Sequence, residues 1–116
     1  MARIAAAIAC GGELDGVHLL SASTIEKALE TQIEVRDLVL RKVIRYGLGF
    51  GLPNDLIVFP NPRTLFWGGF GGSVIMMDLD KKVSAAFAMN KMSPEILLDP
   101  RKERLLTTLY ESYEEL

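Results

Sequence analysis

The chain has 116 residues, a length that suits one small domain and is too short for two independent cores. Hydrophobic residues make up 49% and charged residues 24%, which excludes a disordered or fibrous protein and indicates a packed globular one. Thirteen basic residues against 15 acidic ones give a formal net charge of -2, so we expect no nucleic-acid partner.

The longest apolar stretch runs from Ile4 to Cys10, far short of the run of about 20 residues that spans a bilayer. Because no signal peptide is recognisable either, we expect a cytoplasmic protein with no membrane partner. Cys10 is the only cysteine and His18 the only histidine, so we expect neither a disulfide nor a metal site, and no cofactor. The sequence favours Cys10 as a small buried residue and His18 as a structural one.

Two helices are predicted in the first third of the chain. The alanine-rich run from Ala2 to Cys10 predicts a helix that is buried on most sides and ends at Gly11-Gly12. A turn and a short extended piece follow. The segment from Ser23 to Glu26 fits a capping box, which predicts a second helix from about Thr24 to Ile33 with a narrow apolar face.

The middle of the chain is typical of strands. Tyr46 to Leu52 places glycine at every second position, which predicts a strand whose glycine face lies close to another segment. The stretch from Pro53 to Arg63 is rich in turn residues and predicts a loop. Thr64 to Trp67, Ser73 to Asp78 and Val83 to Met89 then predict strands of an antiparallel meander.

The last third is predicted to close this sheet with a helix. Asp78 to Lys81 is typical of a hairpin turn, and Asp99-Pro100 of a helix start. An apolar stripe at helical spacing follows, formed by Leu105, Leu106, Leu109, Tyr110 and Tyr113. The sequence therefore predicts a single α+β domain over residues 1–116, with a meander of three to four strands, two N-terminal helices and a C-terminal helix on the sheet.

Two alternative sites are disfavoured. Gly68 to Ser73 is rich in glycine, but it has neither the spacing of a dinucleotide-binding loop nor the Gly-Lys-Ser/Thr ending of a P-loop. A tight connection between strands explains these glycines. Asp78, Asp80 and Asp99 could suggest a metal site or an acid-base pair, but turn chemistry explains them better.

Four segments resemble, in order, the C-terminal part of β-lactamase-related serine hydrolases. The first is the segment of residues 1–21, in which a helix of small residues is followed by a turn that begins at Gly11-Gly12. Tyr46-Gly-Leu-Gly-Phe-Gly-Leu is similar to a strand that enters the central sheet. Phe66-Trp-Gly-Gly-Phe-Gly-Gly-Ser-Val resembles the segment of the third family motif, and Ala85-Ala-Phe-Ala-Met-Asn-Lys-Met the strand after it. The resemblance implies the C-terminal part of a β-lactamase/transpeptidase-like fold.

The third motif is Lys-Thr-Gly in β-lactamases, and Trp-Gly-Gly in some related class C β-lactamase-like carboxylesterases. Trp67-Gly68-Gly69 matches the esterase version, so the resemblance implies that these residues line a cleft for an ester-type small molecule. It also implies that the backbone N–H of Phe70 forms half of an oxyanion hole. Without the resemblance, Trp67 would be interpreted as a core aromatic residue.

The family's nucleophile is missing from this chain. It is the serine of Ser-x-x-Lys, which works with the tyrosine of Tyr-x-Asn. No serine here has lysine three residues on, and no tyrosine has asparagine two residues on, so we expect no catalytic residue.

Relatives commonly read Asp-Leu-Ala-Arg where this chain begins with Met1-Ala-Arg. Met1 is then an internal residue of a longer ancestor, an alternative start or a gene-model boundary, and we expect an incomplete domain. Two hypotheses follow. The chain is the C-terminal segment of a serine ester hydrolase that works through an acyl-enzyme, or it is a non-catalytic remnant that associates with itself or with a partner through exposed sheet or helix faces.

Overall fold

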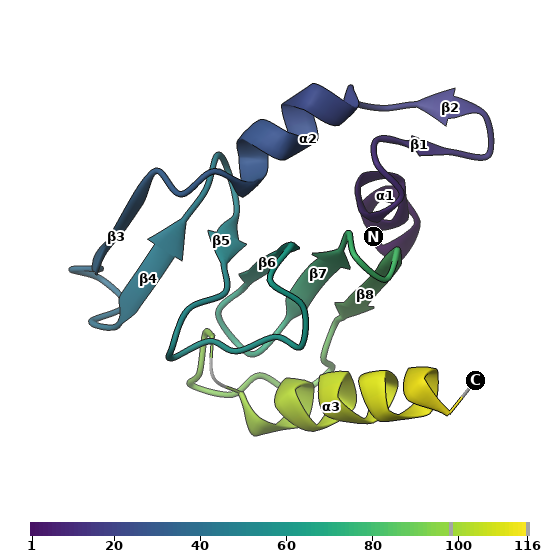
Figure 1. Cartoon of the computed structure of the whole chain (residues 1–116). Coiled ribbons are helices and arrows are strands. Elements are labelled where there is room, and N and C mark those ends of the chain that lie inside the picture. The colour runs from purple at the N-terminus through teal and green to yellow at the C-terminus, as the bar shows by residue number, and fades with distance from the viewer. Residues whose placement is uncertain (98, 116) are drawn as a thin grey trace.

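A computed structural model describes residues 1–97 and 99–115 of the chain. Within these residues, three helices and eight strands follow one another along the sequence (Figure 1). The elements are α1 (Ala2–Ala9), β1 (Glu13–Leu14), β2 (Val17–His18), α2 (Ala22–Leu29), β3 (Ile33–Arg36), β4 (Val43–Tyr46), β5 (Gly51–Leu52), β6 (Thr64–Gly68), β7 (Val74–Asp78), β8 (Val83–Phe87) and α3 (Pro100–Glu114).

The sheet is an antiparallel meander in which strands β3 to β8 follow one another in sequence order, and β1 and β2 form a separate hairpin. The predicted α+β class, the meander and the three helices are confirmed. The sheet has six strands, however, rather than the three to four expected. The additional strands lie at one edge, where β3 pairs with β4 from Ile33↔Tyr46 to Arg36↔Val43.

The predicted strand from Tyr46 to Leu52 is wrong, because the chain turns back within it. β4 ends at Tyr46 and β5 begins at Gly51; the Gly47 N–H donates to the Phe50 carbonyl at 2.9 Å, and Gly49 has a φ of +81°. The expected close approach is confirmed for Gly47 and Gly51 but not for Gly49, where an added Cβ would meet open space. A Cβ on Gly51 would lie 2.9 Å from the Phe66 ring, and one on Gly47 would collide with the Ala28 carbonyl.

The second helix begins and ends earlier than predicted. Ser21, not Ser23, is its N-cap, and the Ser21 Oγ accepts a hydrogen bond from the Thr24 N–H at 3.1 Å. The helix ends at Leu29 rather than Ile33, because the Gln32 N–H donates to the Tyr46 carbonyl at 2.8 Å. That long-range bond places the next residues beside β4, where they form β3.

Two clusters of buried side chains lie on opposite faces of the sheet. Figure 1 shows α1 and α2 on one side of the strands and α3 on the other. One cluster joins α1 and α2 to the sheet through Ala5, Ile8, Ala9, Ile25, Ala28, Leu52, Leu65 and Met77. The other joins α3 and the loop after β5 to it through Ile44, Ile57, Phe66, Met76, Leu97 and Tyr110. β6 and β7 are therefore covered on both faces.

The first helix is less buried than predicted. α1 packs on β7 and β8 through Ala5, Ile8 and Ala9, but Ile4 is 65% exposed and Cys10 is also exposed. The expectation of a buried Cys10 is wrong, because only one side of this two-turn helix faces the sheet. His18 is exposed, and its Nε2 lies 3.1 Å from the Glu13 carboxylate of the facing strand.

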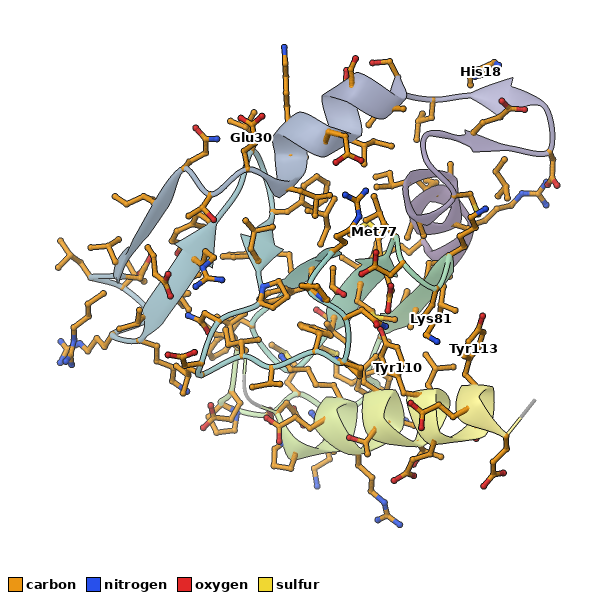
Figure 2. The ribbon with its side chains drawn as sticks, in the orientation of Figure 1. His18, Glu30, Met77, Lys81, Tyr110 and Tyr113 are labelled. Atoms are coloured by element: carbon orange, nitrogen blue, oxygen red, sulfur yellow. The ribbon has the colours of Figure 1, made fainter. Side chains whose placement is uncertain are left out.

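Asp78 and Asp99 stabilise the backbone of two turns, as predicted: the hairpin turn between β7 and β8, and the start of α3. The Asp78 carboxylate accepts hydrogen bonds from the backbone of Asp80 and Lys81, each at 3.0 Å. The Asp99 carboxylate caps α3 at the Arg101 N–H, and Pro100 is the first helical residue. The Tyr110 hydroxyl donates to Asp78 at 2.7 Å, while the Tyr113 ring lies 5.6 Å from the Lys81 ammonium (Figure 2).

Among residues 1–97 and 99–115, no helix combines the length and the apolarity that crossing a bilayer requires.

Candidate functional site

Trp67 lies where the central strand β6 reaches the surface. The preceding residues Thr64, Leu65 and Phe66 are at most 2% exposed, whereas the indole of Trp67 is 36% exposed. The Trp67 ring packs against Tyr46, with ring centroids 5.8 Å apart and a tilt of 39°. Trp67 is therefore a partly exposed aromatic residue supported from the side, not a fully buried core residue.

A hydrogen-bond network holds the Tyr46 ring in place. Its hydroxyl donates to the Asp37 carboxylate at 2.6 Å, and the other carboxylate oxygen accepts from the Val39 and Leu40 N–H groups, both at 2.8 Å. The Tyr46 hydrogen bond lowers the pKa of Asp37, and partial burial together with Asp37 raises the pKa of Tyr46 to about 12. Sequence reasoning found Tyr46 only as part of a strand and missed Asp37.

Gly68 is buried against the segment that leads into α3. A Cβ at this position would lie 2.7 Å from the Ile96 carbonyl oxygen and 3.2 Å from the Lys102 ammonium. The Lys102 Nζ donates to the same carbonyl at 2.8 Å, and burial lowers the pKa of Lys102. Close packing therefore requires glycine at this position. The Ile96 carbonyl and the Lys102 side chain occupy the space into which a side chain of residue 68 would project, so they shield this side of the backbone from solvent.

Gly69 and the following glycines form the turn from β6 to β7. The Gly69 N–H donates to the Ser73 carbonyl at 3.1 Å, and the Gly72 N–H to the Gly69 carbonyl at 3.2 Å. A Cβ on Gly69 would lie 2.5 Å from the Ser73 hydroxyl. Gly71 and Gly72 have φ values of +100° and +104°, a conformation that favours glycine. The predicted tight connection between the strands is thus confirmed.

Phe70 sits at the exposed corner of this turn. Its residue surface is 64% exposed. The hydrogen bonds of the turn involve Gly69, Gly71, Gly72 and Ser73, and within the described part of the chain none of them uses the Phe70 N–H. This amide is therefore available to an acceptor from outside the turn.

Asp99 and Arg101 form a hydrogen-bonded clamp on the same turn, in which Arg101 bonds both to the turn and to Asp99. The Arg101 guanidinium donates to the Gly71 carbonyl at 3.1 Å, to the Lys91 carbonyl at 2.6 Å and to the Asp99 carboxylate at 2.7 Å. Asp99 is 1% exposed and also accepts from the Ser93 hydroxyl at 2.6 Å. Hydrogen bonds from Arg101 and Ser93 lower the pKa of Asp99. The sequence identified Asp99 only as a helix cap and gave no signal for the Arg101 clamp.

The described residues contain no assembled nucleophile. Ser93 donates to Asp99, Ser84 to the Ala2 carbonyl, and Ser21 caps α2. None of the hydrogen bonds found in residues 1–97 and 99–115 joins a serine hydroxyl to a lysine or histidine side chain.

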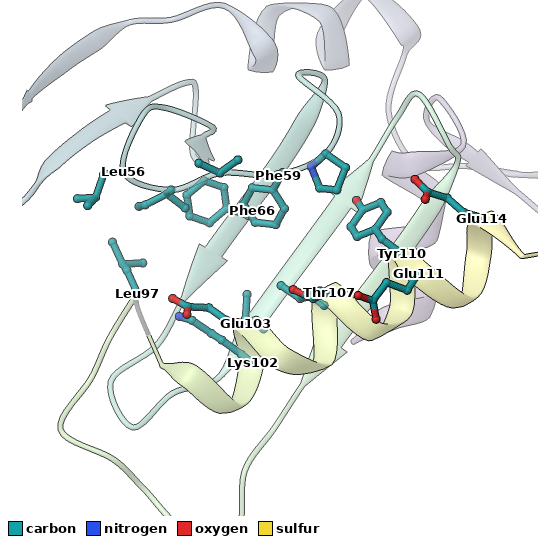
Figure 3. A pocket seen from close by; sticks show the side chains of 15 residues that line it. Leu56, Phe59, Phe66, Leu97, Lys102, Glu103, Thr107, Tyr110, Glu111 and Glu114 are labelled. Atoms are coloured by element: carbon teal, nitrogen blue, oxygen red, sulfur yellow. The ribbon is translucent and has the colours of Figure 1, made fainter.

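A large cavity lies on the side of β6 that faces α3. It is a groove of about 500 Å³ between α3 and the loop of residues 56–60 (Figure 3). Phe66 contributes to its lining, but Trp67, Gly68, Gly69 and Phe70 do not. The residues of the predicted substrate cleft therefore lie outside the lining of this groove, although Leu97 and Lys102 of the lining lie beside Gly68.

An antiparallel meander with helices on both faces is the arrangement of the C-terminal part of a β-lactamase/transpeptidase-like fold. Solved structures match this arrangement, and they include the following two. One is a family VIII carboxylesterase, with 32% identity, a TM-score of 0.88, and coverage of 95% of this chain and 30% of that protein.

The other is a penicillin-binding protein homologue from Caulobacter crescentus, with 36% identity, a TM-score of 0.89, and coverage of 96% of this chain and 30% of that protein. No protein-family model matches the sequence, and neither does any curated protein. The predicted resemblance to the serine β-lactamase-related family is confirmed, and the chain spans about 30% of the length of each relative.

Proposed function

We propose that this chain supplies one wall of the acyl-transfer site of a serine ester hydrolase. Trp67, Gly68 and Gly69 border the cleft, and the Phe70 N–H is one of the two donors to the developing oxyanion. The nucleophile and its base come from residues outside this chain. The reaction is transfer of an acyl group from an ester to a serine oxygen and then to water, with release first of the alcohol and then of the acid.

The observation that carries the proposal is the Phe70 amide. Within the described residues neither it nor the Gly71 N–H makes a hydrogen bond, whereas the Gly69 and Gly72 N–H groups and the Gly71 carbonyl are paired. An unpaired N–H in a fixed turn is what an oxyanion donor requires, because its direction is set before the substrate charge develops. The Arg101 bond to the Gly71 carbonyl supports the turn directly beside it.

The exposed aromatic side chains of this segment support an ester rather than a purely ionic substrate. Trp67 is 36% exposed and is fixed by the Tyr46 ring, and Phe70 adds a second exposed aromatic side chain. Apolar walls with one or two well-placed donors are typical of small-molecule sites. The similarity to a carboxylesterase also favours an ester substrate.

The test uses a chimera in which this chain replaces the matching segment of the carboxylesterase. Phe70→Pro removes the N–H, and Phe70→Ala, the matched control, removes the ring but keeps the N–H. We expect Phe70→Pro to lower kcat for p-nitrophenyl acetate about 100-fold to 1000-fold and Phe70→Ala to lower it far less. Equal rates in the two variants, with unfolding midpoints also equal, would contradict the oxyanion role.

A further inference from the structure

The hairpin of β3 and β4 ends in an apolar tip, which we define as residues 37–42. Leu38 and Val39 in this tip are 91% and 86% exposed. The turn is ordered, because the Asp37 carboxylate accepts from two backbone N–H groups and the Arg41 N–H donates to the Asp37 carbonyl at 2.8 Å. A fixed turn therefore holds two large aliphatic side chains in water, which is typical of a contact surface.

Cations flank these two side chains. Arg36 and Arg41 are exposed, and in the part of the chain that the structure describes neither belongs to an ion pair. Lys42 lies 3.8 Å from Glu95. The only carboxylate of the tip, Asp37, is bound to the Tyr46 hydroxyl and to its own turn. The tip thus presents an apolar centre with positive charge on either side.

The groove beside α3 has the complementary character. Its floor is apolar, with the rings of Phe59 and Phe66 in contact at 5.0 Å between centroids. Three carboxylates of α3 line its rim, those of Glu103, Glu111 and Glu114 (Figure 3). The one lysine in the lining, Lys102, is 4% exposed and donates to the Ile96 carbonyl. The accessible charge of the groove is therefore negative.

We infer that the tip of one copy of this chain docks in the groove of a second copy. The apolar centre of the tip would cover the floor of the groove, and Arg41 of the tip and the adjoining Arg36 would face the carboxylates of the rim. The tip does not fill its own groove, since Leu38 and Val39 are almost fully exposed. Neither surface includes Trp67 or Phe70, although Asp37 of the tip also holds Tyr46 and Lys102 of the groove lies beside Gly68.

The contact joins two different surfaces, so each added copy leaves a free tip at one end and a free groove at the other. Such a heterologous contact builds open chains or closed rings rather than only dimers. Sedimentation equilibrium of the full chain from micromolar to millimolar concentration should therefore show a mass that rises past the dimer and falls when salt is added. A monomer at every concentration would overturn the inference.

Cysteine pairs test the register of the contact. In a Cys10→Ser background, chains carrying Val39→Cys are mixed under mild oxidation with chains carrying Thr107→Cys, a position that lines the groove. The expected product is the mixed disulfide. Thr108→Cys, exposed on α3 but outside the groove, is the matched control and should react more slowly. Equal rates for Thr107→Cys and Thr108→Cys, or faster pairing of Val39→Cys with itself, would contradict the docking.

Charge changes test the composition of the two surfaces. Leu38→Asp should weaken association about tenfold or more without loss of stability, because Leu38 is 91% exposed. Val17→Asp, an exposed aliphatic position on β2, should leave association unchanged. Glu111→Lys should weaken it, and combination with Arg41→Glu should restore it. Unchanged association in Leu38→Asp, or no rescue in the charge swap, would overturn the inference.

Discussion

β6 and β3 belong to one sheet but differ in their surroundings. In β6, Thr64, Leu65 and Phe66 are buried between α1 and α2 on one face and α3 on the other, while all four residues of β3 are exposed. β3 pairs only with β4 and lies at the edge of the sheet. The proposed wall of the acyl-transfer site therefore lies at the end of the buried strand β6. The proposed contact tip follows the exposed edge strand β3.

The largest expected difference between the two regions is in stability. Leu65→Ala removes a side chain that is 0% exposed and should lower the free energy of unfolding by about 2 to 5 kcal/mol. Val35→Ala on β3, 43% exposed, should change it by less than about 0.5 kcal/mol. Urea unfolding followed by the emission of Trp67, the only tryptophan, measures both. Similar losses in the two variants would show that the edge is also part of the core.

The glycine turn should be the next most sensitive feature. Gly72→Ala combines a φ of +104° with a collision against the Asp99 carboxylate, so it should lower the free energy of unfolding by well over 1 kcal/mol. Gly16→Ala is a matched control, because its φ is also positive, at +79°, but its Cβ would meet open space. Equal losses, measured by thermal unfolding, would mean that the Asp99 clamp does not constrain the turn.

The same clamp should make stability depend on acid. The pKa of Asp99 is lower in the folded chain than in the unfolded one, where it is about 3.9. The folded state therefore binds this proton more weakly, and the stabilisation is complete above about pH 4 and is lost as the pH falls towards the folded pKa. Asp99→Asn should flatten this acid limb of the unfolding curve. The exposed Asp15→Asn should leave it unchanged, and a limb identical in Asp99→Asn would contradict the assignment.

Control variants aside, the smallest change in stability is expected at Tyr46, which lies on β4 beside β3 and whose ring contacts Trp67 of β6. Tyr46→Phe keeps the ring beside Trp67 but removes the hydrogen bond to Asp37, which should lower the free energy of unfolding by about 1 kcal/mol. Tyr46→Ala also removes the ring contact and should shift the Trp67 emission to longer wavelength. Identical emission spectra of Tyr46→Ala and the unmodified chain would show that Tyr46 does not shield the indole.

Features set by neighbouring residues could be predicted from the sequence. The aspartate turn at Asp78, the cap at Asp99 and the tight glycine turn after Trp67 each depend on local backbone geometry, and all three are confirmed. The antiparallel order of the strands between Thr64 and Met89 followed from the short turns predicted between them and from the resemblance to a known family. The exposed position of Phe70 in the turn agrees with its predicted role but does not test it.

Features set by distant contacts could not be predicted. The second helix ends early because Gln32 bonds to Tyr46, and β3 exists because of its pairing with β4. The support of Trp67 by Tyr46 and the bond from Arg101 to the Gly71 carbonyl join residues far apart in the chain. Cys10 is exposed because α1 packs on the sheet with one side only, which helical periodicity alone does not determine.

The central claim is that this chain contributes a wall and an oxyanion donor, but no nucleophile, to a serine hydrolase site. The most direct measurement is labelling of the full chain with a fluorophosphonate probe, followed by intact mass and peptide mapping. We predict no labelled serine in this chain alone, because among the described residues no hydrogen bond joins a serine hydroxyl to a lysine or histidine side chain. Stoichiometric labelling of any serine in the chain would contradict the account.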